Sequence, residues 1–252
     1  MKVCFNGCSF TVGEGFPEQQ RDQYIYDRLL TKQFGFDSTN VAVGGSSNHT
    51  IFMRSAREIL SNKYDLVFTQ WTALNRVWFY PGPDTKFFIN DRAYPDYKYR
   101  DLYLNPSEKK TFCNTLLLMN HDYNNIMELI DYCNILCALA ETNSTKLVFI
   151  NGLVPWQDDL VRPLTTDLGS ILSEYTKSIL DFDTRDDAEL IEFFTKLQIK
   201  FQELDQTKWT NLFASFASTQ TDLGPQGHHP GVISHDRMAN TIAEYLTNQS
   251  IL

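Results

Sequence analysis

The sequence predicts an α/β fold in which a mainly parallel sheet is covered by helices on both faces. Short runs that are apolar throughout alternate with longer segments in which apolar residues recur at helical spacing. Strands buried on both faces are apolar at every position, and strands that alternate with helices usually pair in parallel. The chain has 252 residues, 42% of them hydrophobic, and contains no Pro/Gly/Ser-rich linker and no repeat of fixed period. We therefore expect a single domain over residues 1–252.

The order of the predicted elements follows from these patterns. The expected strands are residues 2–6, 39–43, 65–71 and 146–152. The expected helices are residues 18–34, a segment that carries Ile51 to Leu60 after the capping residues of "GGSSN", a segment that carries Ile126 to Ala140, and a last helix that carries Met238 to Leu246.

Two stretches interrupt this alternation. Residues from about 77 to 106 mix aromatic residues with Pro, Asp and Asn without a sustained period, and long insertions of this kind usually form lids or binding loops. Tyr and Trp are enriched both in carbohydrate or acyl pockets and in protein interfaces, so protein partners are also expected through this insertion. A second, helical insertion is expected at about residues 160 to 205.

Charge and cysteine content exclude several classes of function. The net charge of −9 argues against a nucleic-acid-binding surface, which needs clustered Lys and Arg. No apolar run is long enough for a membrane span or a signal-peptide core, so we expect a soluble, cytoplasmic protein with no membrane partner. Five cysteines are an odd number, which favours reduced thiols over a disulfide framework.

Cofactor and metal sites are not expected either. The spacing of Gly7, Gly13 and Gly15 fits neither the dinucleotide nor the P-loop fingerprint. Cys133 and Cys137 are one helical turn apart on an apolar face, where buried thiols are far commoner than zinc ligands. The three histidines near the C-terminus have no acidic or cysteine cluster beside them.

Acyl transfer fits the remaining polar segments. "GCS", "GGSSN" and "QWTALNR" each follow an expected strand, and parallel sheets bind their ligands at the carboxyl ends of the strands. Ser9 stands at the first of these ends and supplies a hydroxyl nucleophile, and His229, just before the last helix, supplies a base. Judged by its own surroundings, Ser9 also suits the simpler role of a helix-capping loop serine.

These segments resemble the blocks of the SGNH (GDSL-type) hydrolases, which have a flavodoxin-like three-layer α/β/α fold and cleave esters or remove acyl groups. "GCS" matches the G-D-S block except for its cysteine, "NVAVGGSSN" is similar to the second block, and "QGHHP" is similar to the D-x-x-H-P block. The resemblance implies that Ser9 is the nucleophile and His229 the catalytic histidine. It also implies that the N–H of Gly45, with Gly44 as the near alternative, contributes to an oxyanion hole.

The sequence departs from the family pattern at the residue that supports the histidine. Gln226 stands where the family has the aspartate of D-x-x-H-P. An amide can orient an imidazole but supplies no charge, and in a serine protease the change from aspartate to amide costs about 10⁴ in kcat. Asp222, a backbone carbonyl or Gln226 itself could orient His229, so the expected centre is a Ser-His dyad or a variant triad.

A second departure concerns the oxyanion hole. The third family block, G-x-N-D, is replaced by "QWTALNR". Thr72 aligns without gaps on the oxyanion asparagine of the family, and Asn75 is the nearest asparagine. Arg76 suits either an anionic substrate or a structural ion pair.

Two functional hypotheses follow. The first is a serine esterase or deacylase that hydrolyses a small-molecule or carbohydrate ester, with an O-acetyl group on a carbohydrate as one example. The second is an SGNH-fold protein with weakened catalysis that serves as a binding or structural component. Because "GCSFT", "GGSSN", "QWT" and "HPG..SH" together resemble a divergent branch common in bacteriophage and bacterial genomes, this component is expected in a virion.

Overall fold

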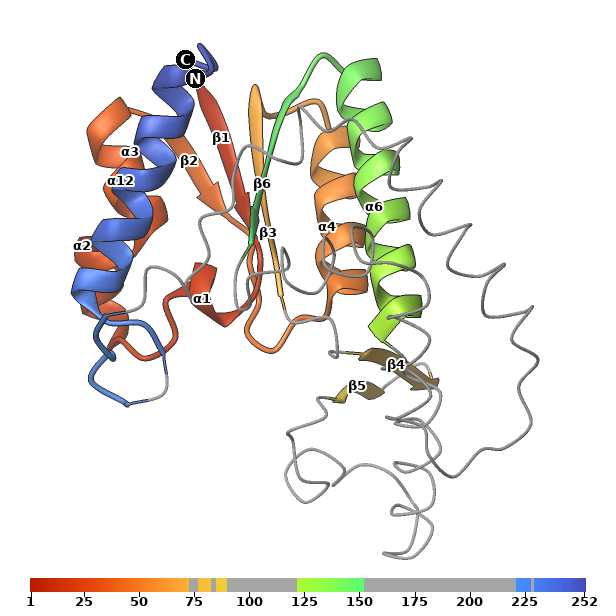
Figure 1. The fold of residues 1–252 in the computed structure, drawn as a ribbon, viewed down its shortest axis with the longest axis horizontal. Helices are drawn as coiled ribbons and strands as arrows, with labels where there is room; N and C mark the ends of the chain where they lie inside the picture. Colours follow the sequence, from red (N-terminus) through yellow and green to blue (C-terminus); the bar gives the residue numbers. More distant parts are fainter. Residues whose placement is uncertain (73–76, 83–84, 90–121, 152–220, 228) are drawn as a thin grey trace, which may run out of the picture.

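A computed structural model of the protein describes residues 1–72, 77–82, 85–89, 122–151, 221–227 and 229–252. At its centre is a parallel sheet whose strands lie in the order β2-β1-β3-β6 (Figure 1). The four strands are β1 (Lys2–Asn6), β2 (Asp37–Asn40), β3 (Leu66–Trp71) and β6 (Lys146–Asn151). Taken in chain order within this sheet, the arrangement is 2-1-3-4, which begins the flavodoxin-like order.

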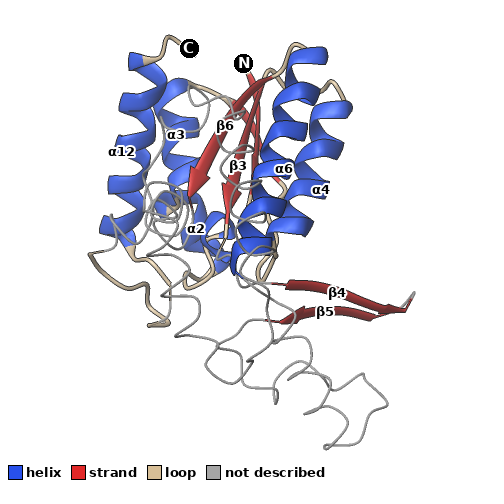
Figure 2. Cartoon of the chain, turned by 45° about the vertical axis from the view of Figure 1, so that its right-hand side comes forward, coloured by secondary structure: helices blue, strands red, loops and turns tan. Residues whose placement is uncertain are grey.

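Helices cover both faces of the sheet. The helices α3 (Tyr26–Phe34) and α12 (Val232–Asn248) pack together on one face, and α4 (Asn48–Leu60) and α6 (Asp122–Thr142) pack together on the other (Figures 1 and 2). The expected α/β fold with a three-layer α/β/α arrangement is therefore confirmed.

The burial of each strand explains its composition. All six residues of β3 are buried, and β1 is buried at four of its five positions. The rings of Phe5 and Phe68 stack across these strands with their centroids 4.6 Å apart. Within the described sheet β2 is an edge strand, and its residues alternate between exposed and half-buried, which is why its sequence "DSTN" is polar.

The expected boundaries of this edge strand are wrong, because the strand itself is polar and the apolar run follows it. The strand expected at residues 39–43 begins and ends earlier, at Asp37–Asn40. Its register follows β1, with Lys2 opposite Asp37 and Phe5 opposite Asn40. The apolar run "VAV" lies just beyond the strand and leads into the loop that contains the glycines.

The helix expected over residues 18–34 is two helices, α2 (Glu18–Tyr24) and α3. Ile25 between them has an extended backbone, with φ −79° and ψ 145°, and its side chain is buried. The backbone N–H of Tyr26 donates to Nδ1 of His235 in α12, at 3.3 Å. A tertiary contact, which the local pattern does not encode, thus supplies an acceptor at the start of α3.

The aromatic-rich insertion begins with a β-hairpin that its sequence did not lead us to expect. Strands β4 (Val77–Gly82) and β5 (Thr85–Ile89) pair antiparallel (Figure 2). The sequence "PGPD" at residues 81–84, which overlaps the end of β4, is a turn signal within a stretch that has no sustained period. The rest of this insertion and all of the expected insertion at residues 160–205 lie outside the described residues.

Candidate active site

Ser9 lies at the carboxyl end of β1. It is the first residue of a short helix, α1 (Ser9–Val12), which ends at Gly13 in the left-handed conformation, with φ 74°. The Ser9 residue is 3% exposed. Because Ser9 begins the helix, its backbone N–H has no acceptor within α1. Within the described residues, neither the hydroxyl nor the backbone N–H of Ser9 makes a hydrogen bond to another protein group.

A buried polar cluster holds the Ser9 turn in place. Gln70, in the middle of buried β3, accepts hydrogen bonds from Thr11 Oγ1 at 2.5 Å and from the Tyr26 hydroxyl at 2.9 Å. The amide of Gln70 donates to Cys8 Sγ at 3.6 Å. Gly7 is needed here because a Cβ at this position would overlap Thr11 Oγ1. Cys8, where the family has an acid, thus serves as an acceptor for Gln70.

The "GGSSN" loop lies next to this turn. The backbone N–H of Val43 donates to the carbonyl of Gly7 at 3.3 Å, which connects the two loops directly. Gly45 is in the left-handed region, with φ 73°, a conformation that favours glycine. Ser47 caps α4 by accepting from Thr50 N at 3.3 Å. The structure thus brings the loop of Gly44 and Gly45 to the Ser9 end of the sheet.

Arg54 supports the same loop from the second turn of α4. Its guanidinium donates to Asn6 Oδ1 at 3.2 Å and to Ser46 Oγ at 3.1 Å. Partial burial, with a smaller contribution from Arg57, lowers the pKa of Arg54 from its usual value. No acidic side chain pairs with Arg54 in the part of the chain that the structure describes. Its positive charge therefore remains beside the loop that holds Gly45.

Thr72 follows β3 and is held by a residue that sequence reasoning missed. Asn48 Oδ1 accepts from the backbone N–H of Thr72 at 2.8 Å, and Asn48 Nδ2 donates to the Thr72 carbonyl at 3.3 Å. Thr72 is 1% exposed, and its Oγ1 makes no hydrogen bond within the described residues. The sequence pattern of "GGSSN" predicts only a capping role for its Ser and Asn residues. Since Ser47 is the cap, the Asn48 side chain is free to reach across to β3.

His229 is presented by a short antiparallel turn before α12. Leu223 and Pro230 form a bridge, and Gly224 N donates to the His229 carbonyl at 2.8 Å. The imidazole packs edge-on against Phe10, with ring centroids 5.5 Å apart. It also lies against Gly15, where an added Cβ would be 2.9 Å from the His229 Cβ. His229 is therefore brought to the segment that begins with Ser9, 220 positions earlier in the chain.

Among the described residues, an acid that the motifs did not indicate lies within ion-pair distance of His229. Glu14 Oε2 lies 3.7 Å from His229 Nε2, and the Glu14 carboxylate also lies on Gly44. Among the described residues, Ser9 Oγ makes no hydrogen bond with His229. The only sequence signal for Glu14 is its place between Gly13 and Gly15, which by itself predicts no more than a loop.

Of the two side chains expected to orient His229, that of Asp222 has other contacts. Asp222 Oδ1 accepts from Ser234 N at 2.8 Å and Oδ2 accepts from Ile233 N at 3.0 Å, so its carboxylate caps α12. Burial alone would raise the pKa of Asp222, but the Ser234 hydroxyl and these N–H groups lower it. Gln226 is exposed in the turn between Gly224 and Gly227. Within the described residues, neither the Asp222 nor the Gln226 side chain hydrogen-bonds to His229.

The remaining expectations concern three residues near the site, metal binding, two cysteines and membrane-spanning helices. Asn75, Arg76 and His228 lie outside the described residues. Within the described ranges, no group of three or more His, Cys, Asp and Glu residues is arranged to hold a metal ion. Cys133 and Cys137 are buried and form no disulfide within the described residues. The described helices include none with the length and apolar character needed to cross a membrane.

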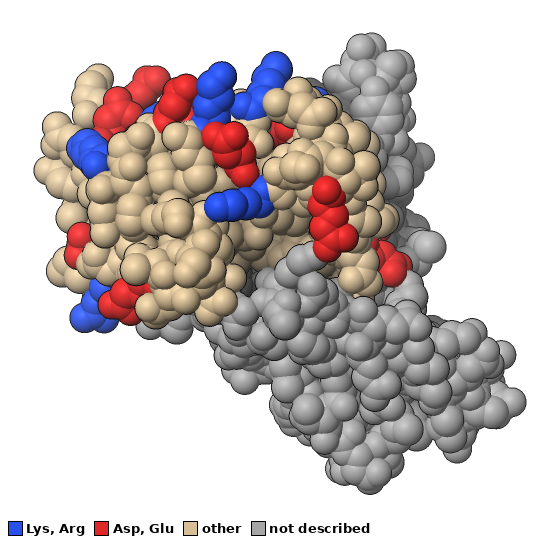
Figure 3. Space-filling view, turned by 90° about the horizontal axis from the view of Figure 1, so that it is seen from above, with Lys and Arg blue, Asp and Glu red and all other residues tan. Residues whose placement is uncertain are grey.

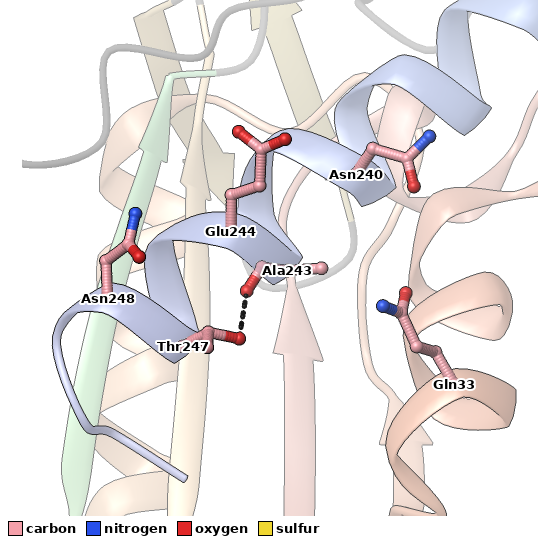
Figure 4. A pocket seen from close by; sticks show the side chains of 6 residues that line it. All are labelled: Gln33, Asn240, Ala243, Glu244, Thr247 and Asn248. Carbon is pink, nitrogen blue, oxygen red and sulfur yellow. Dashed lines mark hydrogen bonds between the residues drawn. The ribbon is translucent and has the colours of Figure 1, made fainter.

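Two further surface features lie away from the strand ends that carry Ser9. Viewed from the amino ends of the strands, the surface carries acidic and basic side chains intermixed (Figure 3). A groove of about 420 Å³ lies between α3 and α12. It is lined by Gln33, Asn240, Ala243, Glu244, Thr247 and Asn248 (Figure 4). The Thr247 hydroxyl in this groove already donates to the Ala243 carbonyl, and no nucleophile-base pair faces the groove.

Comparison with solved structures gives matches over nearly the whole chain. A G-D-S-L family lipolytic protein from Desulfitobacterium hafniense is 11% identical, with a TM-score of 0.47, over 97% of this chain and 99% of that chain. The esterase EstA from Pseudoalteromonas sp. is 8% identical, with a TM-score of 0.48, over 100% and 99%. A catalytic mutant of Axe2, an acetylxylan esterase from Geobacillus stearothermophilus, is 11% identical, with a TM-score of 0.43, over 97% and 93%.

The chain has an SGNH-hydrolase-like fold. This assignment rests on the strand order and on the positions of "GCS", "GGSSN" and His229 around one end of the sheet, since the structural matches are distant. No protein-family model matches the sequence, and no curated protein matches it. The chemistry of the site therefore has to be argued from its own residues.

Proposed function

We propose that this protein is a serine hydrolase that cleaves esters. The observation that supports the proposal most directly is that β1, the glycine loop and the turn before α12 converge at one sheet end. There Ser9 lies beside the loop of Gly45, and His229 packs on Phe10 and Gly15. A nucleophile, a base and backbone donors are the parts that acyl transfer needs.

In the proposed reaction, Ser9 Oγ attacks the ester carbonyl carbon while His229 Nε2 takes the hydroxyl proton. The carbonyl oxygen becomes an oxyanion, which the N–H groups of Ser9 and Gly45 stabilise. Thr72 Oγ1 is the third donor, because it is buried and makes no other hydrogen bond within the described residues; Asn75 is the alternative for this role. His229 then protonates the leaving alcohol, and a water molecule hydrolyses the acyl-enzyme by the same steps in reverse.

For the substrate, we propose an ester of small size, with an acylated carbohydrate as the class that the aromatic-rich insertion favours. Aromatic side chains present flat apolar faces together with polar edges, which suits sugar rings.

The test is turnover of p-nitrophenyl acetate and butyrate, together with labelling by a fluorophosphonate probe. We expect labelling at Ser9, located by mass spectrometry of the digested protein, and loss of both turnover and labelling in Ser9→Ala. His229→Asn should reduce turnover strongly, and Ser250→Ala, at an exposed serine, is the matched control. Absence of both turnover and labelling in the folded wild type would refute the proposal.

One observation favours a second function, that of a binding or structural component with weakened catalysis. His229 Nε2 faces Glu14, and neither Gln226 nor Asp222 hydrogen-bonds to His229. In this alternative the aromatic-rich insertion binds a protein partner, as in a virion. A folded protein that the fluorophosphonate does not label, but that forms a stable complex through this insertion, would favour the second function.

A further inference from the structure

Glu14 occupies a position inside the candidate active site that the proposed mechanism does not use. Its backbone N–H donates to the Ser9 carbonyl at 2.9 Å, so the residue is tied to the proposed nucleophile. From there its side chain reaches both His229 and the glycine loop. The Glu14 carboxylate therefore lies beside the place where the proposed reaction forms its oxyanion.

Two glycines are required for this arrangement. A Cβ at Gly44 would overlap Glu14 Oε1, so only glycine lets the carboxylate lie on the loop. Gly15, with φ 104°, lets the backbone after Glu14 pass against the His229 ring. The carboxylate is thus accommodated by the shapes of the two loops that form the site.

Within the described residues, no lysine or arginine forms an ion pair with Glu14. In the described part of the chain, the one ion-pair contact of Glu14 is with His229 Nε2, at 3.7 Å. The His229 imidazole has to be neutral to act as a base, so it cannot neutralise Glu14 at the start of the reaction. The Glu14 side chain is 43% exposed, so a ligand can reach it. A lone carboxylate in this place opposes a developing oxyanion, because like charges raise the energy of the transition state.

A positive charge on the substrate reverses this effect. A cationic nitrogen near the ester would pair with Glu14 and move its carboxylate away from His229 Nε2. The positive charge would also offset the repulsion between Glu14 and the oxyanion. Such an interaction contributes selectivity more than raw affinity, because a neutral substrate leaves the acid uncompensated. The net charge of −9 also favours the approach of cations over anions.

We infer that Glu14 determines substrate specificity, and that the site accepts esters that carry a cationic nitrogen close to the ester carbonyl, on the alcohol or the acyl side. The inference rests on the proposed ester hydrolysis at Ser9. The competing role for Glu14 is to hold His229 in place, which would affect all substrates alike.

Two pairs of esters separate charge from shape. Acetylcholine carries a trimethylammonium group on its alcohol side, and 3,3-dimethylbutyl acetate carries a neutral tert-butyl group of the same shape at that position. Betaine ethyl ester and ethyl 3,3-dimethylbutanoate differ in the same way on the acyl side. Acid release in a pH-stat gives kcat/KM for each ester with wild type and variants.

In at least one pair, Glu14→Gln should lower the cation-to-neutral ratio of kcat/KM by about fivefold, as expected for a partly exposed charge pair. Glu14→Lys should lower the ratio further, and added salt should reduce the wild-type preference. Glu18→Gln removes the same charge from an exposed position in α2 and should leave the ratio unchanged. Melting temperatures of all variants show that each is folded.

The outcomes distinguish this inference from the function on which it rests. If Glu14→Gln changes both members of each pair by the same factor, Glu14 only positions His229 and the specificity inference is overturned. If neutral esters are hydrolysed and Ser9 is labelled but no ratio depends on Glu14, the inference alone fails. If no ester is hydrolysed and Ser9 is not labelled, the proposed function fails and the inference fails with it.

Discussion

Replacing His235 with asparagine should remove a pH-dependent part of the protein's stability. His235 is fully buried in α12, where it stacks on Tyr26 and accepts a hydrogen bond from the Tyr26 N–H through Nδ1. Burial lowers the pKa of His235 from 6.5 to about 4; Asp222 acts in the opposite direction, and His229 adds slightly to the decrease. The folded protein therefore holds this imidazole neutral at pH 7.

The sign of the effect follows from proton binding in the two states. Between the folded pKa of about 4 and the ordinary value of 6.5, the unfolded chain binds a proton at this site that the folded chain does not. The stabilisation is thus fully present above pH 6.5 and is lost as the pH falls towards 4. The two pKa values differ by about 2.5, which corresponds to about 3 kcal/mol in total, of which about 2 kcal/mol is lost by pH 5.

Urea unfolding at pH 7.5 and pH 5.0 measures this loss. The asparagine Oδ1 of His235→Asn can replace Nδ1 as the acceptor for the Tyr26 N–H, and it does not titrate. Although lost packing should make the variant less stable than wild type at pH 7.5, the wild type should lose about 2 kcal/mol more than the variant between the two pH values. Equal losses in the two proteins would show that His235 titrates normally and refute the reasoning.

Three further predictions concern residues beneath or beside the site. Burial raises the pKa of Asp27 from 3.8 to about 6, against smaller effects of Asn40 and Arg28, so its contribution to stability falls as pH rises through about 4 to 6. In urea unfolding, the stability of Asp27→Asn relative to wild type should therefore be greater at pH 8 than at pH 3.5 by about 3 kcal/mol, and an unchanged difference would refute the raised pKa. Asn48→Ala removes both hydrogen bonds to the Thr72 backbone and should lower kcat about tenfold with little change in KM, whereas an unchanged kcat would exclude the proposed role of Thr72. Arg54→Met removes the donor to Asn6 Oδ1 and should lower stability by about 1–2 kcal/mol and also lower kcat. Arg54→Lys should recover part of both losses, and normal kinetics in Arg54→Met would exclude a role of Arg54 in positioning the glycine loop.

Several parts of the fold could be predicted because their signals are local. The strands β1, β3 and β6 each contain a run of at least three apolar residues, and the apolar stripe of α12 is visible in its sequence. The break at Ile25 could not be predicted, because the acceptor for the Tyr26 N–H comes from His235, more than 200 residues later. The edge position of β2 was likewise invisible, since a strand's place in the sheet depends on its neighbours.

The candidate site shows the same division. Ser9, Gly45 and His229 stood out because each lies in a short motif, although their catalytic roles remain predictions. Glu14 and Asn48 did not stand out, because their functions depend on what their side chains reach in other loops. Nothing in "GEG" or "SSN" indicates that one side chain lies on Gly44 and the other holds Thr72.

The sequence by itself determined the α/β class, the alternation of most elements and the three segments that meet at the sheet end, because hydrophobic period and glycine content act over a few residues. The tertiary structure alone decided how those segments contact one another. It directed the Asp222 carboxylate to the start of α12, used Cys8 as an acceptor for Gln70, and set Glu14 against His229. These contacts join residues far apart in the chain, and hydrogen bonds and charges act between groups only once folding has brought them within a few ångströms.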